Sequence, residues 1–284
     1  MVKVSKIGVC AGHYNGANRI PAQFATAPEY KAYSEGTAMY NLAGLICSRY
    51  PQIFNARTEA GVAKPWRPDF PERAKRLATQ KCDYAFELHT NWSLKNSKTP
   101  NRGVFLVITS LCYEDRKNRE KRAKEEIALA TMLWKPLADD LGLKFQIRQK
   151  KGGGNWDWYS FINFCKKRGI AHPMIIEHGY HMDFAGDAEE YARRIADHYA
   201  HVLAAVYGAC PYAEPANDLA KGAKGAGVRW VQWHLTRQGF ALPKYGVDGI
   251  WGNETEAAFR AFQASNGLFV DGRLKAADRT ILKK

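Results

Sequence analysis

Four residues far apart in the chain have the types that a hydrolytic zinc site requires: His13, Glu35, His89 and Glu177. Two imidazoles and one carboxylate form a three-ligand zinc site that leaves one coordination position open for water. A further carboxylate beside such a site can act as the general base. The chain contains 8 histidines and 28 acidic residues, so residue type alone does not select these four. Their positions on the predicted elements must do so.

Three of the four residues follow segments with the pattern of β-strands. His13 comes after an alternating run and a glycine turn, and His89 and Glu177 each close a short, mostly apolar run. Glu35 instead opens a predicted amphipathic helix over residues 35–50. Ligands of α/β proteins bind at the carboxyl ends of strands. Three strand ends and one helix start can therefore meet at a single edge of a sheet.

The segments around these residues occur in a recognisable order: Gly12-His13, Glu35, Arg73, Asp83, Leu88-His89-Thr90-Asn91 and Pro173 to Tyr180. Together they resemble the zinc-dependent N-acetylmuramoyl-L-alanine amidases of the type 3 family, over about residues 3–207. Those enzymes cut the amide between muramic acid and the first alanine of the peptidoglycan stem peptide. The resemblance implies that His13, Glu35 and His89 are the ligands of one Zn²⁺ and that Glu177 is the catalytic carboxylate. Asn91 and Tyr180 are predicted substrate contacts.

The sequence departs from the family pattern beside two of these residues. The family usually has an acidic residue before the first ligand and two glycines after it, where this chain has Cys10 and Tyr14-Asn15. After the catalytic carboxylate the family tends to have a Ser-Asn pair, where this chain reads His181-Met182-Asp183. Glu29 is a rival for the second ligand. Glu35 is preferred because the amphipathic helix follows it directly.

Three neighbouring residues allow two interpretations each. His178 and His181 could stabilise a tetrahedral oxyanion or contact the metal ligands, although surface turn residues are the commoner outcome. Cys10 could ligate zinc, although a buried strand cysteine is more usual.

The C-terminal part carries an independent signal. Residues 209–227 are rich in Ala, Pro, Gly and Lys and predict a flexible linker. The stretch 228–282 resembles the peptidoglycan-binding domain 1 family, a small three-helix module. The residues that carry this resemblance are Val231-Gln232-Trp233-His234-Leu235, Gly239, Asp248-Gly249, Gly252, Thr255, Ala258, Phe262-Gln263, Gly267-Leu268 and Asp271-Gly272. Tyr245 and Trp251 are predicted ligand contacts.

These observations predict two domains. The first, residues 1–208, is expected to be an α/β catalytic domain with a mixed sheet and helices on both faces. The linker 209–227 joins it to a small all-α domain, residues 228–284, that binds the cell wall.

Charge and composition indicate which classes of binding partner to expect. The formal net charge of +14 favours binding to polyanions, which for a wall hydrolase would be anionic wall polymers, and no nucleic-acid motif accompanies it. The six cysteines show no paired metal spacing and are expected to be mostly free and buried. No apolar run is long enough to span a bilayer.

The first nine residues are too short and too quickly strand-like for a secretory signal. We therefore expect a phage endolysin that stays in the host cytoplasm until it is released to the wall. The expected reaction is zinc-dependent hydrolysis of the muramoyl-alanine amide. A zinc peptidase acting within the stem peptide and a catalytically inactive wall-binding protein are the alternatives.

Overall fold

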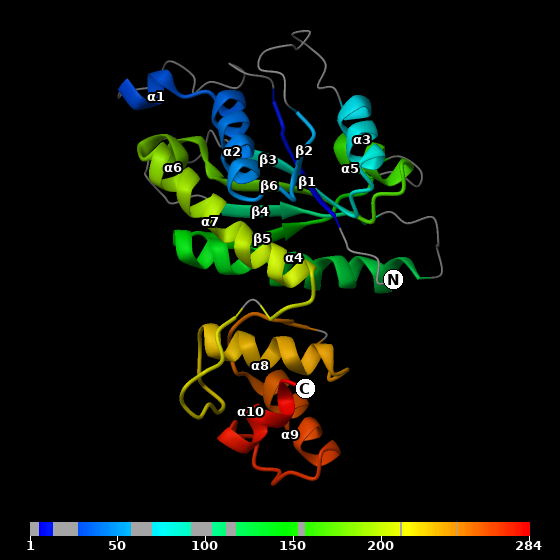
Figure 1. Cartoon of the computed structure of the whole chain (residues 1–284), viewed down its shortest axis with the longest axis vertical. Helices are drawn as coiled ribbons and strands as arrows, with labels where there is room; N and C mark the ends of the chain where they lie inside the picture. The colour runs from blue at the N-terminus through cyan, green and yellow to red at the C-terminus, as the bar shows by residue number, and fades with distance from the viewer. Residues whose placement is uncertain are drawn as a thin grey trace. The chain divides into compact units, whose positions relative to one another are not determined.

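The computed structural model describes residues 6–13, 28–57, 70–91, 104–111, 118–152, 157–210, 212–242 and 244–284, except for the side chain of Met182. The chain divides into two compact units (Figure 1). The first comprises residues 1–130 and 136–199, and the second comprises residues 131–135 and 200–284.

The first unit is built on a six-stranded sheet with the order β2-β1-β3-β6-β4-β5. The four strands β2, β1, β3 and β6 run parallel, whereas β4 is antiparallel to β6 and parallel to β5. The predicted mixed sheet is therefore confirmed. The strands are β1 (Ile7–Ala11), β2 (Phe54–Asn55), β3 (Tyr84–Asn91), β4 (Val104–Ile108), β5 (Lys144–Arg148) and β6 (His172–Tyr180).

Helices cover both faces of this sheet, as the sequence predicts. On one face, α3 (Phe70–Thr79) and α5 (Ser160–Lys167) enclose an apolar cluster with side chains of β1, β4 and β6. On the other face, Phe86 of β3 lies against Tyr199 of α7, with ring centroids 6.4 Å apart. The remaining helices of this unit are α1 (Pro28–Ala32), α2 (Glu35–Arg49), α4 (Arg119–Leu141) and α6 (His181–Gly186), and α7 spans Ala188–Val206.

The central strands are buried because helices lie above and below them. All five residues of β1 are buried, as expected for a parallel strand covered on both faces. Gly8 permits a close contact with α3, since a Cβ there would lie 2.2 Å from Cδ2 of Leu77. This packing holds the start of β1 against α3.

The second unit contains the three predicted helices, α8 (Ala226–Arg237), α9 (Asn253–Ser265) and α10 (Ala276–Leu282). They enclose a core that includes Val231, Trp251, Phe259 and Phe262. Two isolated β-bridges connect residues that precede α8 to this module: Leu219 pairs with Leu274, and Lys224 pairs with Ile250. Leu219 and Lys224 lie in the stretch predicted as linker, so their backbones are held against the helical module.

A buried glutamine organises each half of this module. Nε2 of Gln232 lies 2.8 Å from Oδ1 of Asp248 and 2.9 Å from Oγ1 of Thr255, and Oε1 accepts from the backbone N–H of Gly249 at 2.8 Å. The same pattern recurs one helix later around Gln263, with Asp271, Asp278 and Gly272 as its partners.

The turns beside the two glutamines are also alike. Gly249 and Gly272 have φ angles of 81° and 71°, which favour glycine. A Cβ on either glycine would lie 2.9 Å from Nε of an arginine, Arg229 or Arg260 respectively. The module thus contains the same helix-and-turn arrangement twice, with α9 shared between the two copies.

No helix among the described ranges is long and apolar enough to cross a membrane. The cysteines that the structure describes, Cys10, Cys47, Cys82, Cys165 and Cys210, are all free thiols. Three of these are buried, whereas Cys47 and Cys210 are partly exposed. Cys112 lies outside the described residues, as do Tyr14 and Asn15.

Candidate metal centre

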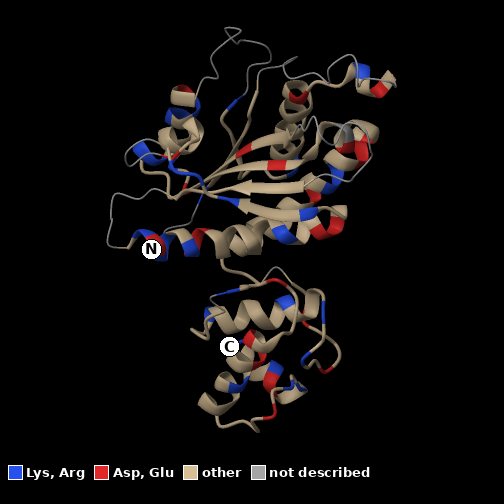
Figure 2. Ribbon diagram, turned by 180° about the vertical axis from the view of Figure 1, so that it is seen from behind, with Lys and Arg blue, Asp and Glu red and all other residues tan. Residues whose placement is uncertain are grey.

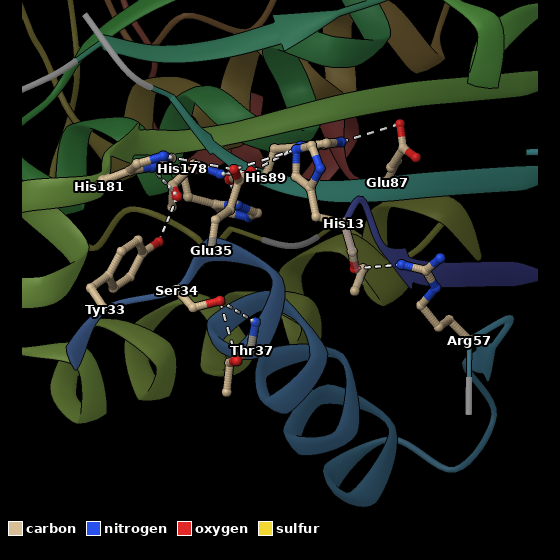
Figure 3. A network of polar contacts seen from close by, with 12 residues as sticks. His13, Tyr33, Ser34, Glu35, Thr37, Arg57, Glu87, His89, His178 and His181 are labelled. Atoms are coloured by element: carbon tan, nitrogen blue, oxygen red, sulfur yellow. Dashed lines mark hydrogen bonds and ion pairs between the residues drawn. The ribbon is translucent and has the colours of Figure 1, made fainter. Parts of the chain in front are cut away.

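Three of the four predicted residues meet at one edge of the sheet. His13 follows β1, His89 lies near the end of β3, and Glu35 opens α2. Each offers one ligand atom, and these atoms all lie within 4.8 Å of one another. Figure 3 shows Glu35 directed toward the rings of His13 and His89.

The spacing of these side chains fits a metal ion. Oε2 of Glu35 lies 3.4 Å from Nε2 of His13, and Oε1 lies 2.9 Å from Nδ1 of His89. Zinc holds nitrogen and oxygen ligands at about 2.0–2.1 Å in a tetrahedron, which places neighbouring ligand atoms about 3.3 Å apart. Two imidazoles and one carboxylate are also donors that zinc accepts. The group has the composition and size of a three-ligand metal site.

Glu35 is held at the start of α2 by local capping. Ser34 is the N-cap residue, and its side chain accepts a hydrogen bond from the backbone N–H of Thr37. Oε1 of Glu35 accepts from the backbone N–H of Thr90 at 3.0 Å. The alternative ligand Glu29 lies in the exposed helix α1. The described residues therefore place Glu35, and not Glu29, beside the two histidines.

The charge of Glu35 is stabilised despite its burial. Burial alone would raise the pKa of this carboxyl, but the hydrogen bond from His89 and the nearby charge of His89 lower it to about 2. An ionised carboxylate is the form that binds a cation. Arg57 further fixes the turn by donating a hydrogen bond to the backbone oxygen of His13.

Glu177 lies on the neighbouring strand, directly opposite His89 in the register of β3 and β6. Directly paired residues project from the same face of a sheet, so Glu177 is beside the metal group. Its Oε2 is buried and makes no hydrogen bond within the described part of the chain. Burial raises the pKa of Glu177 to about 7, although the charge of His89 acts in the opposite direction.

The sequence interpretation gave no role to two buried residues that support His89, Glu87 and Arg73. Glu87 and Arg73 are 1% and 2% exposed. Oε1 of Glu87 lies 2.5 Å from Nη1 of Arg73, and its Oε2 lies 3.3 Å from Nε2 of His89. A signal was present, because residues two apart on a strand share a face. A carboxylate two residues before a predicted ligand would be on the ligand's side of the sheet.

His178 and His181 are buried, so the interpretation of both as surface turn residues is wrong. Nδ1 of His178 lies 3.0 Å from the backbone oxygen of His89. Nδ1 of His181 lies 2.8 Å from Oγ1 of Thr90, whose oxygen is also 2.6 Å from the hydroxyl of Tyr33. His181 reaches the metal group through Nε2, which is 3.8 Å from Oε2 of Glu35.

The structure places the four predicted substrate contacts in different environments. Asn91 and Tyr180 pair with each other at the ends of β3 and β6, so they lie near the metal group, and their role stays a prediction. Tyr245 is 53% exposed and can reach a ligand. Trp251 cannot, because it is 1% exposed and packs on Phe259 with ring centroids 5.1 Å apart. The structure thus corrects Trp251 from a ligand contact to a core residue.

Cys10 is a buried strand cysteine, in line with the commoner interpretation. Its Sγ lies 3.4 Å from Nη1 of Arg73, and burial raises the pKa of its thiol. A thiol binds metal as the thiolate, so this environment does not favour Cys10 as a ligand.

Comparison with known sequences identifies the C-terminal module. Residues 224–277 match the protein family described as "Putative peptidoglycan binding domain". Over 54 residues the chain is 50% identical to the N-acetylmuramoyl-L-alanine amidase CwlL of Bacillus licheniformis, covering 19% of this chain and 15% of that protein. A probable N-acetylmuramoyl-L-alanine amidase of the same organism is 44% identical over 54 residues, with the same coverage. The chain thus matches only 15% of the length of each of these relatives.

Similar solved structures include the SleB N-terminal domain, which is 37% identical with a TM-score of 0.24. The match covers 25% of this chain and 94% of the SleB domain. The N-acetylmuramyl-L-alanine amidase Ami1 of Mycobacterium abscessus is 15% identical with a TM-score of 0.47, and the match covers 71% of this chain and 98% of Ami1.

Proposed function

We propose that this chain is a zinc-dependent hydrolase that cuts the amide between N-acetylmuramic acid and L-alanine in bacterial peptidoglycan. One observation carries the proposal. Glu177 pairs directly with His89, beside a His-Glu-His group of metal-site dimensions, in a chain whose residues 224–277 match a peptidoglycan-binding family. A carboxylate next to a three-ligand metal group is the arrangement that metal-assisted amide hydrolysis requires.

His13, Glu35 and His89 would hold the metal. Zinc bound there would supply a Lewis acid that polarises the scissile carbonyl and lowers the pKa of water. Because Glu35 is ionised and buried, its carboxylate would offset part of the cation's charge.

Glu177 is the proposed proton carrier. A general base works best when its pKa lies near the working pH, and burial raises the pKa of Glu177 to about 7. Its carboxylate takes a proton from the attacking water. It then gives that proton to the nitrogen of L-alanine, which leaves as a neutral amine.

His181 is the proposed donor to the developing oxyanion. Burial lowers the pKa of His181, so its ring is neutral at pH 7. When the Tyr33 hydroxyl donates to Thr90 and the Thr90 hydroxyl donates to Nδ1 of His181, the ring proton is left on Nε2. That nitrogen lies 3.8 Å from Oε2 of Glu35, on the side of the metal group. A neutral donor held in this way stabilises negative charge that appears only in the transition state.

The C-terminal module is proposed to keep the enzyme on the wall. The chain has 42 Lys and Arg against 28 Asp and Glu, and the basic residues are spread over elements of both units (Figure 2). Such a distribution favours general attraction to anionic wall polymers, whereas the module would supply the attachment to peptidoglycan itself.

The bond that is cut can be identified by digesting purified peptidoglycan and sequencing the new ends by mass spectrometry. The wild type should release new amino-terminal L-alanine without new reducing sugars, and a chelator should abolish the release until zinc is restored. Glu177→Gln should lower the rate by about 10²- to 10⁴-fold. Glu189→Gln, at an exposed site on α7, is the matched control and should behave as wild type.

Other outcomes of this digestion are equally informative. New ends within the stem peptide would contradict the amidase and make the chain a zinc peptidase. Wall binding without any new ends would make it a binding protein with an inactive metal group.

A finer proposal is that hydrolysis serves lysis of a host cell from within, as in a phage endolysin, with the chain in the host cytoplasm until release. Its support is the pairing of a candidate hydrolytic centre with a wall-binding module. Expression in a host with and without a separate pore-forming protein tests it. Rapid lysis only with the pore supports the endolysin role, and lysis at the same rate without it contradicts that role.

A further inference from the structure

We propose that Glu87, anchored by Arg73, is a positioning residue for the metal ligand His89: it binds Nε2 of the ring and leaves Nδ1 as the atom that faces the metal. The inference rests on the metal centre of the proposed function, and it does not depend on which bond the enzyme cuts.

The first observation is the contact between Glu87 and the ring. Both residues project from the same face of β3, two positions apart. Oε2 of Glu87 lies 3.3 Å from Nε2 of His89, while Nδ1 of the same ring lies 2.9 Å from Oε1 of Glu35. The two ring nitrogens therefore face two different carboxylates. Glu35 belongs to the metal group with His13, so Nδ1 is the nitrogen on the side of the metal.

The second observation is that Glu87 itself cannot move freely. Its other oxygen, Oε1, lies 2.5 Å from Nη1 of Arg73, and both side chains are 2% exposed. Arg73 comes from α3 and also donates to the backbone oxygen of Ala11 at 3.0 Å, directly before the turn that carries His13. One guanidinium thus links the end of β1 to the carboxylate that holds His89.

The third observation is the shape of the space around the ring. A Cβ on Gly12 would lie 2.0 Å from both Cε1 and Nε2 of His89. The backbone N–H of Gly12 donates to the oxygen of Leu88 at 3.0 Å, so this glycine cannot withdraw without breaking the pairing of β1 and β3. The ring of His89 is confined between Gly12 on one side and the two carboxylates at its nitrogens.

A metal-binding histidine commonly donates its other N–H to a carboxylate, which fixes the tautomer and the orientation of the ring. Losing such a carboxylate typically costs about 10- to 100-fold in metal affinity. Stability alone does not account for Glu87, because a buried Arg–Glu pair is often no more stabilising than apolar residues of the same size. Positioning of His89 gives the pair a function.

The test is the zinc affinity of the full-length protein, measured by competition with a chelator of known affinity. Glu87→Gln should bind zinc about 10- to 100-fold more weakly than wild type. The matched control is Glu126→Gln. Glu126 is also a buried carboxylate paired with a histidine, since its Oε1 lies 2.7 Å from Nδ1 of His172, and its substitution should leave the zinc affinity unchanged.

Glu87→Gln leaves Arg73 buried without its counter-charge, and the variant could lose stability for that reason. The double variant Arg73→Met with Glu87→Gln removes both charges, so it restores a neutral interior. Its circular dichroism should match wild type, yet its zinc affinity should stay low. If either folded variant binds zinc as tightly as wild type, Glu87 only neutralises Arg73 and the inference is overturned.

A second measurement determines directly which nitrogen of the His89 ring is protonated and which binds the metal. In the zinc-loaded protein, nitrogen NMR of selectively labelled histidine should show His89 protonated at Nε2 and metal-bound at Nδ1. Metal binding at Nε2 would overturn the inference. Failure of the proposed function appears differently, as a wild-type protein that binds zinc through Nδ1 of His89 but releases no L-alanine termini from peptidoglycan.

Discussion

The metal centre and the glutamines of the C-terminal module both bury polar side chains, but they do so in opposite ways. Around His89 the interior contains the ionisable groups Glu35, Glu87 and Arg73. Around Gln232 and Gln263 the central group is a neutral amide whose oxygen and nitrogen are both hydrogen-bonded.

The difference shows what each arrangement is for. Buried charges are costly unless they are paired, so a cluster of carboxylates around histidines is expected where a cation must be held. A fully bonded amide instead fixes one packing of helices and turns without such a cost. The stability of the metal centre should therefore depend strongly on bound metal and little on changes in the C-terminal module. The stability of the module should depend on its buried amides and not on metal.

The largest effect should follow loss of a metal ligand. The side chain of His13 is 28% exposed, so His13→Ala should leave the fold intact while removing one of three ligands. We expect zinc to be absent from the purified variant and wall hydrolysis to fall about as far as it does with a chelator. Elemental analysis and digestion of peptidoglycan check this.

His198→Ala, on α7 away from the metal group, is the matched control and should retain zinc and activity. Binding of the His13 variant to insoluble peptidoglycan should be unchanged. Loss of wall binding together with zinc would contradict the separation of the two regions.

A smaller but still strong effect should follow Gly12→Ala. The new methyl group would lie 2.0 Å from the ring of His89, so the ring must leave its position between Gly12 and Glu87. We expect zinc affinity to fall by about 10-fold or more, as for loss of a group that orients a ligand. Competition titration measures it.

The comparison for this substitution is Gly44→Ala in α2. A Cβ there has open space, with nothing within 4 Å, and alanine favours a helix over glycine by about 1 kcal/mol. Gly44→Ala should therefore be neutral or stabilising with unchanged zinc affinity. Equal zinc affinities for the two alanine variants would be inconsistent with the placement of His89.

The third effect belongs to the module. Gln232→Ala removes the amide that joins Asp248, Gly249 and Thr255. At about 1 kcal/mol per lost hydrogen bond, the free energy of unfolding of the module should fall by about 2–3 kcal/mol. Calorimetry and wall pull-down should both detect the change, whereas zinc affinity should not move.

Gln263→Ala should have a similar effect because it occupies the same position in the second copy. Gln238→Ala is the control, since Gln238 is exposed and its side-chain amide donates to backbone oxygens at the end of α10. If Gln238→Ala destabilised the module as much as Gln232→Ala, the buried amides would have no special role.

The smallest expected effect is the release of protons when zinc binds. Burial would lower the pKa of His89, but the carboxylates of Glu87 and Glu35 raise it well above its usual value. The ring is therefore protonated at pH 7 in the metal-free protein, and zinc can bind only after Nδ1 loses its proton. Burial lowers the pKa of His13, so that ring is already neutral.

Zinc binding at pH 7 should accordingly release at least one proton, from His89 and in part from Glu177, whose pKa of about 7 a nearby cation would lower. The zinc affinity should rise with pH. Calorimetric titrations in buffers of different ionisation enthalpy measure the number of protons released per zinc ion bound. Release of no proton would mean that His89 is neutral before zinc arrives.

Positions at element ends made these residues candidates in the sequence, and the family resemblance singled out His13, Glu35 and His89 as metal ligands. Apolar runs predicted the strands that end near His89 and Glu177, and the amphipathic pattern after Glu35 predicted α2. These signals are local, and the carboxyl ends of neighbouring parallel strands necessarily meet.

The residues that sequence reasoning missed depend on contacts between distant segments. Glu87 is explained only by Arg73 from α3, and Thr90 only by Tyr33 and His181. His181 looked like a turn residue because nothing local shows that it packs against Tyr33, with ring centroids 5.3 Å apart. Trp251 lies in a loop yet fills the module's core, since its burial depends on Phe259 of α9.

One calorimetric experiment on the full-length protein tests the central contrast most directly. The protein should be heated without metal and then with zinc in large excess over its dissociation constant. Zinc binds only the folded metal centre, so at 1,000 times that constant it should stabilise the first unit by about 4 kcal/mol.

We expect the transition of the unit containing the metal centre to move to higher temperature. The transition that Gln232→Ala lowers should stay where it is. Equal shifts of both transitions, or no shift with zinc, would contradict the assignment of the buried charges to metal binding and of the buried amides to the fold.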